Sequence, residues 1–110
     1  PAYPEPPAAR VAAATAAYDR AYRPAGVARQ MSAVLADGSR AARLARIRVP
    51  TLVIHGADDP LIPVAAGEHT AQLIPGARLE IVPGMGHNLP DALASRIVEL
   101  VRGFVAAHPD

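Results

Sequence analysis

Two short apolar runs separated by a helical pattern restrict the fold of this 110-residue sequence more than any other feature. The first run, TLVIH at Thr51–His55, is rich in β-branched residues and apolar on both faces, as in a strand buried between helices. The second run, RLEIV at Arg78–Val82, follows a helix that Pro63 opens and that Pro75 and Gly76 end. Because such crossovers are right-handed and connect parallel strands, the sequence predicts a parallel pair.

The N-terminal half has the spacing of helices. Apolar residues recur at helical intervals from about Ala8 to Arg23, which predicts one helix. A second helix is expected to begin at Pro24 and to end at Gly38, and a short helical turn with Leu44 and Ile47 follows. Two helices this rich in alanine also fit a small helical bundle, which is the alternative interpretation of this half taken alone.

The C-terminal helix completes a strand-helix-strand-helix order. It begins near Pro90 and carries an apolar face made of Leu93, Ile97, Leu100, Val101, Phe104 and Val105. We therefore divide the chain into a helical segment, residues 1–48, and an α/β segment, residues 49–110. Two parallel strands with one helix each leave apolar sheet surface uncovered. The sequence thus predicts the C-terminal part of a larger α/β domain whose earlier strands lie outside it.

Composition excludes several functional classes. The hydrophobic fraction is 51% and the charged fraction 19%, which is typical of a globular protein rather than a disordered one. The net charge is +1 and the arginines are scattered, so we expect neither a nucleic-acid partner nor binding to an anionic membrane. The absence of cysteine excludes disulfides, thiolate metal sites and a cysteine nucleophile, and it fits a cytoplasmic protein.

Polar side chains follow both predicted strands. Asp58 and Asp59 come directly after the first strand, and His87, between Gly84 and Gly86, comes after the second. The carboxyl ends of parallel strands meet at one edge of the sheet, so an aspartate and the histidine are expected to lie in contact. A carboxylate that accepts a hydrogen bond from Nδ1–H fixes the imidazole tautomer and stabilises the imidazolium. The glycines would permit backbone conformations that other residues rarely adopt.

These segments resemble the α/β-hydrolase family. PTLVIHGADDPLIP and IPGARLEIVPGMGHNLP are similar to its acid loop and histidine loop, and the resemblance extends from about Tyr18 to Ala106. It implies that Asp59, three residues after Gly56, is the acid of a Ser-His-Asp triad and that His87 is its histidine. YDRAYRPAGVARQMSAVLADGSR resembles the end of the helical cap in esterase-like members. The resemblance also implies hydrolysis of a small ester-like molecule without a cofactor.

The family nucleophile is missing from the sequence. In the family it lies on a G-x-S-x-G turn earlier in the chain than the acid and histidine, and no such turn occurs here. Ser32 falls in a predicted helix, Ser39 near a helix start and Ser95 in the closing helix. We therefore expect the nucleophile and the oxyanion loop to lie upstream of this chain. The isolated chain is expected to be inactive, and to self-associate or to pair with the missing N-terminal part.

Other roles compete with the triad assignment. Asp59 could be a turn former near Pro60, and Asp58 is expected to be the turn residue of the pair. His87 taken alone could be a polar loop histidine. A metal site from His55, Asp58 and His87 is conceivable by ligand type, but these residues lack a compact metal-binding spacing, so we expect none.

The remaining histidines are expected to have no chemical role. We expect His55 to be packed or hydrogen-bonded, His69 to be solvated, and His108 to lie in a loose terminus. Two alternative functions are a noncatalytic α/β-hydrolase relative that binds ligands, and a truncated remnant without independent activity.

Overall fold

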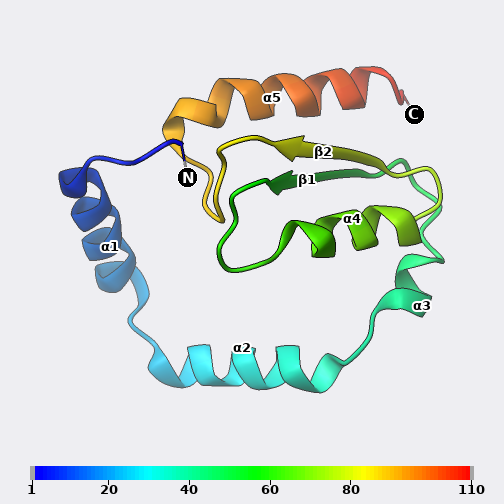
Figure 1. Ribbon diagram of the computed structural model, residues 1–110. Helices are drawn as coiled ribbons and strands as arrows, with labels where there is room; N and C mark the ends of the chain where they lie inside the picture. The colour runs from blue at the N-terminus through cyan, green and yellow to red at the C-terminus, as the bar shows by residue number, and fades with distance from the viewer. Residues whose placement is uncertain (1, 110) are drawn as a thin grey trace. The chain divides into compact units, whose positions relative to one another are not determined.

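The computed structural model describes residues 2–109, which form two compact units. Residues 5–40 make up one unit, and the short N-terminal segment together with residues 41–109 makes up the other. The elements appear in Figure 1, and in chain order they are α1 (Pro7–Ala21), α2 (Pro24–Asp37), α3 (Ala41–Leu44), β1 (Leu52–Gly56), α4 (Val64–Leu73), β2 (Arg78–Val82) and α5 (Asp91–Ala106).

The two strands are parallel neighbours, which confirms the topology predicted from the sequence. The register runs from Leu52 opposite Arg78 to Gly56 opposite Val82. Helix α4 connects β1 to β2 and packs against both, and Figure 1 shows α4 and α5 on either side of the strand pair. Both strands therefore end at the same edge of the sheet, and the loops after Gly56 and Val82 begin side by side.

A small apolar core lies directly behind these loops. Val82 is fully buried, and Met85 and Leu93 pack with it from the loop after β2 and from α5. Tyr3 also packs on this cluster, and the Ala2 amide donates a hydrogen bond of 2.8 Å to the Gly84 carbonyl. The proline-rich lead-in thus contacts the loop after β2, a contact that nothing in the sequence pattern predicts.

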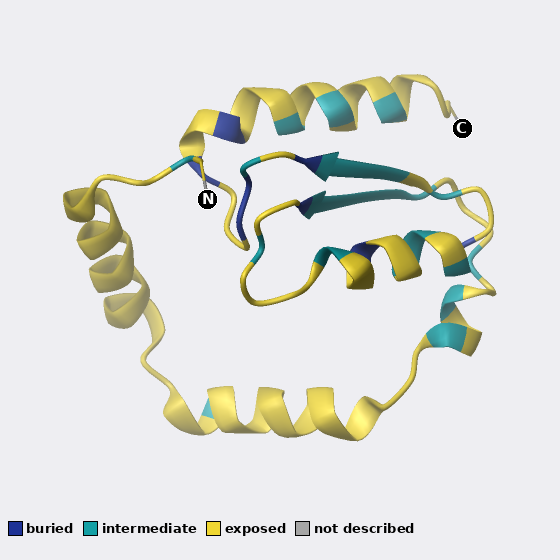
Figure 2. Cartoon of the chain, viewed as in Figure 1, coloured by how far each residue is buried: buried dark blue, intermediate teal, exposed yellow. Residues whose placement is uncertain are grey.

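Burial of β1 is less complete than its sequence predicts. Each residue of Thr51–His55 is half-buried rather than buried, as the intermediate colour of both strands in Figure 2 shows. The physical reason is geometric: the described residues form a sheet of two strands, and one helix on each side cannot cover both faces of an apolar strand. Only Gly56, at the end of the strand, is fully enclosed.

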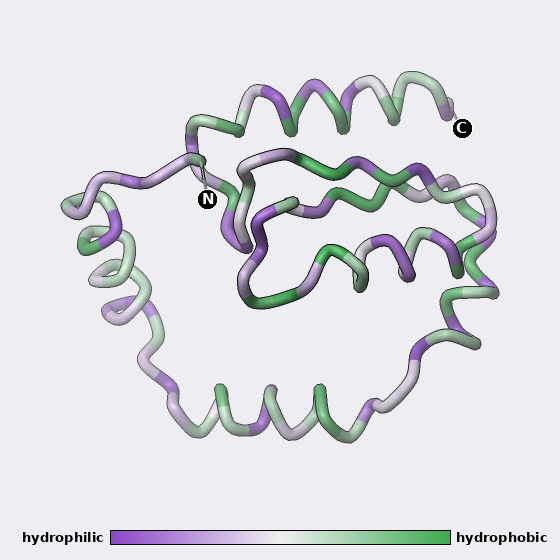
Figure 3. The backbone as a smooth tube through the Cα atoms, in the orientation of Figure 1, coloured by the Kyte–Doolittle hydropathy of each residue, from purple (hydrophilic) through white to green (hydrophobic). Residues whose placement is uncertain are grey.

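The helical unit has the predicted helices but no core of its own. Proline occupies the first turn of both α1 and α2, and Gly38, with φ of 61°, ends α2. Neither helix contains a buried residue. Along α2, an apolar stripe is formed by Val27, Met31, Val34 and Leu35, and Met31, which this pattern would place in a core, is 57% exposed. Figure 3 shows hydrophobic segments recurring along α2. The stripe is therefore present in the sequence but is not covered within this unit, so the small-bundle interpretation is wrong.

No helix within residues 2–109 combines the length and the apolar character that crossing a membrane requires.

Candidate active site

Backbone hydrogen bonds join the loops that follow β1 and β2. The Ala57 amide donates to the Val82 carbonyl at 3.0 Å, and the Asp58 amide donates to the Met85 carbonyl at 3.0 Å. The acid loop, residues 57–62, is thereby fixed against the histidine loop, residues 83–89. The parallel register alone would bring the two loops near each other; these bonds set their relative position.

Glycines allow this close approach in two different ways. A Cβ atom at Gly56 would overlap the carbonyl oxygens of Met85 and Gly86, so only glycine fits where the loops meet. Gly84 has φ of 77°, in the left-handed region, as expected for this loop. The same expectation for Gly86 is wrong, because the residues with positive φ within 2–109 are Gly38, Gly76 and Gly84. Gly86 is instead a buried residue whose carbonyl faces Gly56.

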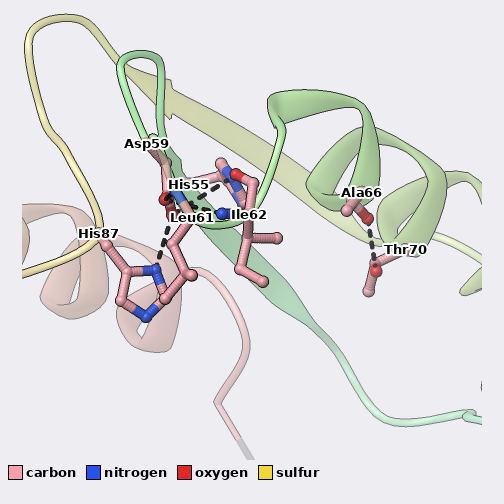
Figure 4. Close-up of polar contacts among 7 residues, drawn as sticks. All are labelled: His55, Asp59, Leu61, Ile62, Ala66, Thr70 and His87. Atoms are coloured by element: carbon pink, nitrogen blue, oxygen red, sulfur yellow. Dashed lines mark hydrogen bonds and ion pairs between the residues drawn. The ribbon is translucent and has the colours of Figure 1, made fainter. Parts of the chain in front are cut away.

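Asp59 and His87 are in direct contact at this edge of the sheet. His87 Nδ1 lies 2.9 Å from Asp59 Oδ2, and the dashed line in Figure 4 marks this bond. The other carboxylate oxygen, Oδ1, accepts hydrogen bonds from the amides of Leu61 at 2.8 Å and Ile62 at 2.9 Å. Asp59 is therefore a turn former through one oxygen and a histidine partner through the other, so the two interpretations are compatible.

The geometry assigns a proton position on the imidazole. A carboxylate oxygen only accepts, so Nδ1 of His87 carries the hydrogen of this bond and Nε2 keeps its lone pair when the ring is neutral. Nε2 points away from Asp59 in Figure 4. The Asp59 side chain is 6% exposed and that of His87 47% exposed, so the acid is enclosed and the ring is open to solvent or to a reactant. Such an imidazole can accept a proton at Nε2 while its carboxylate partner stabilises the resulting cation.

The Asp59 carboxyl is strongly biased toward its charged form. Desolvation opposes ionisation, but hydrogen bonds from Ile62, His87 and Leu61, together with the charge of His87, lower the pKa of Asp59 from 3.8 to about 2. Asp59 therefore stays an anion throughout the pH range in which an imidazole gains and loses a proton.

This shift predicts how stability depends on pH. Because the native pKa of Asp59 is below its ordinary value of 3.8, the contribution of Asp59 to stability is complete above that value and disappears as pH falls toward about 2. We expect the thermal midpoint of the chain to drop over this acid range, and Asp59→Asn to flatten the drop. Circular dichroism melts between about pH 5 and about pH 2 measure it. Asp58→Asn is the matched control, and an equal flattening in that variant would contradict the assignment.

Among the described residues, the second aspartate of the acid loop and the other histidines make no direct hydrogen bond to Asp59 or His87 through their side chains. Asp58 is exposed and contributes its amide to the loop pairing, as expected of a turn residue. His55 is hydrogen-bonded, as expected, with Nε2 3.0 Å from the Ile62 carbonyl oxygen. His69 is exposed on α4, and His108 lies just beyond α5 with Nδ1 2.8 Å from the Phe104 carbonyl oxygen.

A triad would also need a hydroxyl beside His87, and a metal site would need several ligating side chains together. Within residues 41–109, the hydrogen-bond partner of the His87 ring is the Asp59 carboxylate, and no serine or threonine hydroxyl of this range bonds to it. Ser32 donates to the Ala28 carbonyl within α2, and Ser95 is exposed in α5. Within residues 2–109, no three side chains of the histidine, aspartate or glutamate type are grouped so as to hold a metal ion.

Comparisons with known proteins point to one family. The family model described as alpha/beta hydrolase fold matches residues 11–91, which include both site loops. The chain is 47% identical over 55 residues to rhodomycin D methylesterase DauP of Streptomyces sp. strain C5, a match that covers 50% of this chain and 18% of that protein. It is 40% identical over 74 residues to the pimeloyl-[acyl-carrier protein] methyl ester esterase of Aromatoleum aromaticum, which covers 64% of this chain and 30% of that protein.

A chloroperoxidase sequence and the crystal structure of an esterase are also similar to this chain. The chain is 43% identical over 47 residues to the non-heme chloroperoxidase CPO-A1 of Kitasatospora aureofaciens, covering 42% of this chain and 17% of that protein. The crystal structure of esterase RhEst1 from Rhodococcus sp. ECU1013 superimposes with a TM-score of 0.57 and 32% sequence identity. That match covers 63% of this chain and 25% of the esterase. The chain therefore spans less than a third of the length of each of these relatives.

Proposed function

Since this chain belongs to the α/β-hydrolase fold family, we propose that it supplies the acid and the general base of an ester hydrolase. The observation that carries the proposal is the 2.9 Å contact between His87 Nδ1 and Asp59 Oδ2. The nucleophile is a serine in residues outside this sequence. Two facts support this division: no G-x-S-x-G turn occurs in the chain, and the chain spans 18% and 30% of two esterase relatives.

In the proposed reaction, His87 moves one proton twice. Its Nε2 takes the proton of the serine hydroxyl as the oxygen attacks the ester carbonyl, and the cation that forms is paired with the Asp59 carboxylate. The same proton then passes from Nε2 to the leaving alcohol, and water repeats the cycle on the acyl-enzyme. Asp59 remains charged throughout, which agrees with the lowering of its pKa to about 2.

We propose a small-molecule ester as the substrate. Methyl esters are the first class to test, because two relatives with at least 40% identity are named methylesterases or methyl ester esterases. The exposed His87 ring leaves space for an ester carbonyl and a serine to approach Nε2. We further propose that the chain pairs with the sheet strands of the nucleophile-bearing part, and that the enzyme is cytoplasmic, as the cysteine-free sequence favours.

A phosphonylating probe tests the proposal directly. In a longer protein that carries this chain, a fluorophosphonate should label one serine on a G-x-S-x-G turn, because an activated serine oxygen attacks phosphorus as it attacks an ester. His87→Ala should slow labelling at least about 100-fold, the usual contribution of a general base. His69→Ala is the control, since His69 is exposed on α4. Equal labelling of wild type and His87→Ala would contradict the role of His87 as the base.

A further inference from the structure

His55 is a second histidine beside Asp59. It is the second-to-last residue of β1, and its side chain is 13% exposed. Its Nε2 lies 3.0 Å from the Ile62 carbonyl oxygen and 3.8 Å from Asp59 Oδ2. Both of those oxygens accept hydrogen bonds, so Nε2 carries a proton and donates it to Ile62.

Ile62 connects this histidine to the acid. The Ile62 amide donates to Asp59 Oδ1 at 2.9 Å, while its carbonyl accepts from His55 at 3.0 Å. The second oxygen of Asp59 is the one that meets His87. Figure 4 shows the result: His55 and His87 lie at opposite ends of one series of hydrogen bonds, with Ile62 and Asp59 between them.

The His55 ring is also held from the side of α4. A Cβ atom at Gly67 would be 2.7 Å from Nδ1 and 2.9 Å from Cγ of His55, closer than such atoms approach. Gly67 is the buried residue of α4, and the absence of its side chain leaves the room that the ring fills. The ring is thus confined between α4 and the acid loop, in an orientation that directs Nε2 toward Ile62.

We propose that His55 is a positioning residue, which acts through the Ile62 backbone to hold the Asp59 carboxylate in place for His87. Without the Nε2 donor, the Ile62 carbonyl loses its partner, and the amide that binds Asp59 Oδ1 is no longer fixed. Asp59 would then lose part of the hydrogen bonding that favours its anion. The inference rests on the proposed triad roles of Asp59 and His87, but its consequences are visible without hydrolysis.

NMR of a longer protein that carries this chain measures those consequences. His55→Phe keeps a ring and removes the donor, whereas His55→Gln keeps an N–H that can reach the Ile62 carbonyl. In His55→Phe we expect the pKa of Asp59, followed by its carboxyl carbon shift, to rise from about 2 toward 3.8. The downfield Nδ1 proton signal of His87 should also weaken. His55→Gln should retain both wild-type values, as should the surface control His69→Gln.

The outcomes separate the two proposals. Wild-type values in a folded His55→Phe chain would overturn the positioning role and leave the triad proposal intact. If the wild-type chain shows no His87–Asp59 hydrogen bond, the triad proposal and the positioning role both fall. If His55→Phe does not fold, the tautomer of His55 in the wild-type chain decides: a proton on Nε2 supports the proposal, and a proton on Nδ1 overturns it.

Discussion

Replacing His87 by alanine in a longer enzyme that carries this chain is expected to lower kcat for ester hydrolysis about 10⁴-fold. The reason is that the serine would lose the acceptor for its proton, and the leaving alcohol would lose its donor. KM should change little, since the imidazole contributes to the transition state more than to binding. Steady-state kinetics on a short-chain p-nitrophenyl ester and on a methyl ester would measure both constants.

Asp59→Asn should produce a loss of similar size by a different route. The amide can occupy the same space and accept from Leu61 and Ile62 through its oxygen. Its NH₂ group would then face His87, which favours a proton on Nε2 and removes the free lone pair. The fold should survive, so circular dichroism should be unchanged while kcat falls.

Asp58→Asn is the matched control for both variants. Asp58 is next to Asp59 in sequence but exposed, and the contact it makes with the histidine loop comes from its amide, which the substitution retains. We expect a change in kcat of less than about 3-fold, as for surface substitutions away from a site. Equal, small effects in all three variants would favour a noncatalytic relative.

The contact between acid and histidine could be predicted from sequence because it depends on topology. Once Thr51–His55 and Arg78–Val82 are parallel strands, the residues that follow them must begin at the same sheet edge. The choice of Asp59 over Asp58 needed the family resemblance, since both follow the strand within three residues of Gly56. The catalytic roles of Asp59 and His87 stay predictions.

Steric and backbone-mediated features could not be predicted in the same way. That Gly56 must lack a side chain depends on the carbonyls of Met85 and Gly86, which lie far along the chain. The hydrogen bond from His55 to Ile62 ends on a backbone carbonyl. Every residue has such a group, so the residue type at position 62 does not predict this bond. The exposure of Met31 could not be predicted either. An apolar stripe indicates which face of α2 is apolar, but it does not indicate which element packs against that face.

The isolated 110-residue chain is expected to show no ester hydrolysis above a control of buffer plus denatured protein. An oriented Asp59 and His87 can activate water, but without a nucleophile and without donors to the oxyanion the tetrahedral intermediate is poorly stabilised. Loss of a nucleophile alone costs about 10⁶-fold in a serine hydrolase, which places the residual rate near background. Purified chain assayed against p-nitrophenyl esters, with His87→Ala in parallel, gives the measurement.

The same chain should associate with itself at micromolar concentration. Each strand of the described sheet has one unpaired edge, and apolar side chains such as Leu61 at 65% and Val105 at 61% exposure face outward. Light scattering alongside the assay would detect this. Robust turnover by a monomer that disappears in His87→Ala would contradict the proposal that the nucleophile lies outside this sequence. Ser32, Ser39 and Ser95 would then be replaced by alanine in turn, because a complete active site would require one of these hydroxyls to reach His87.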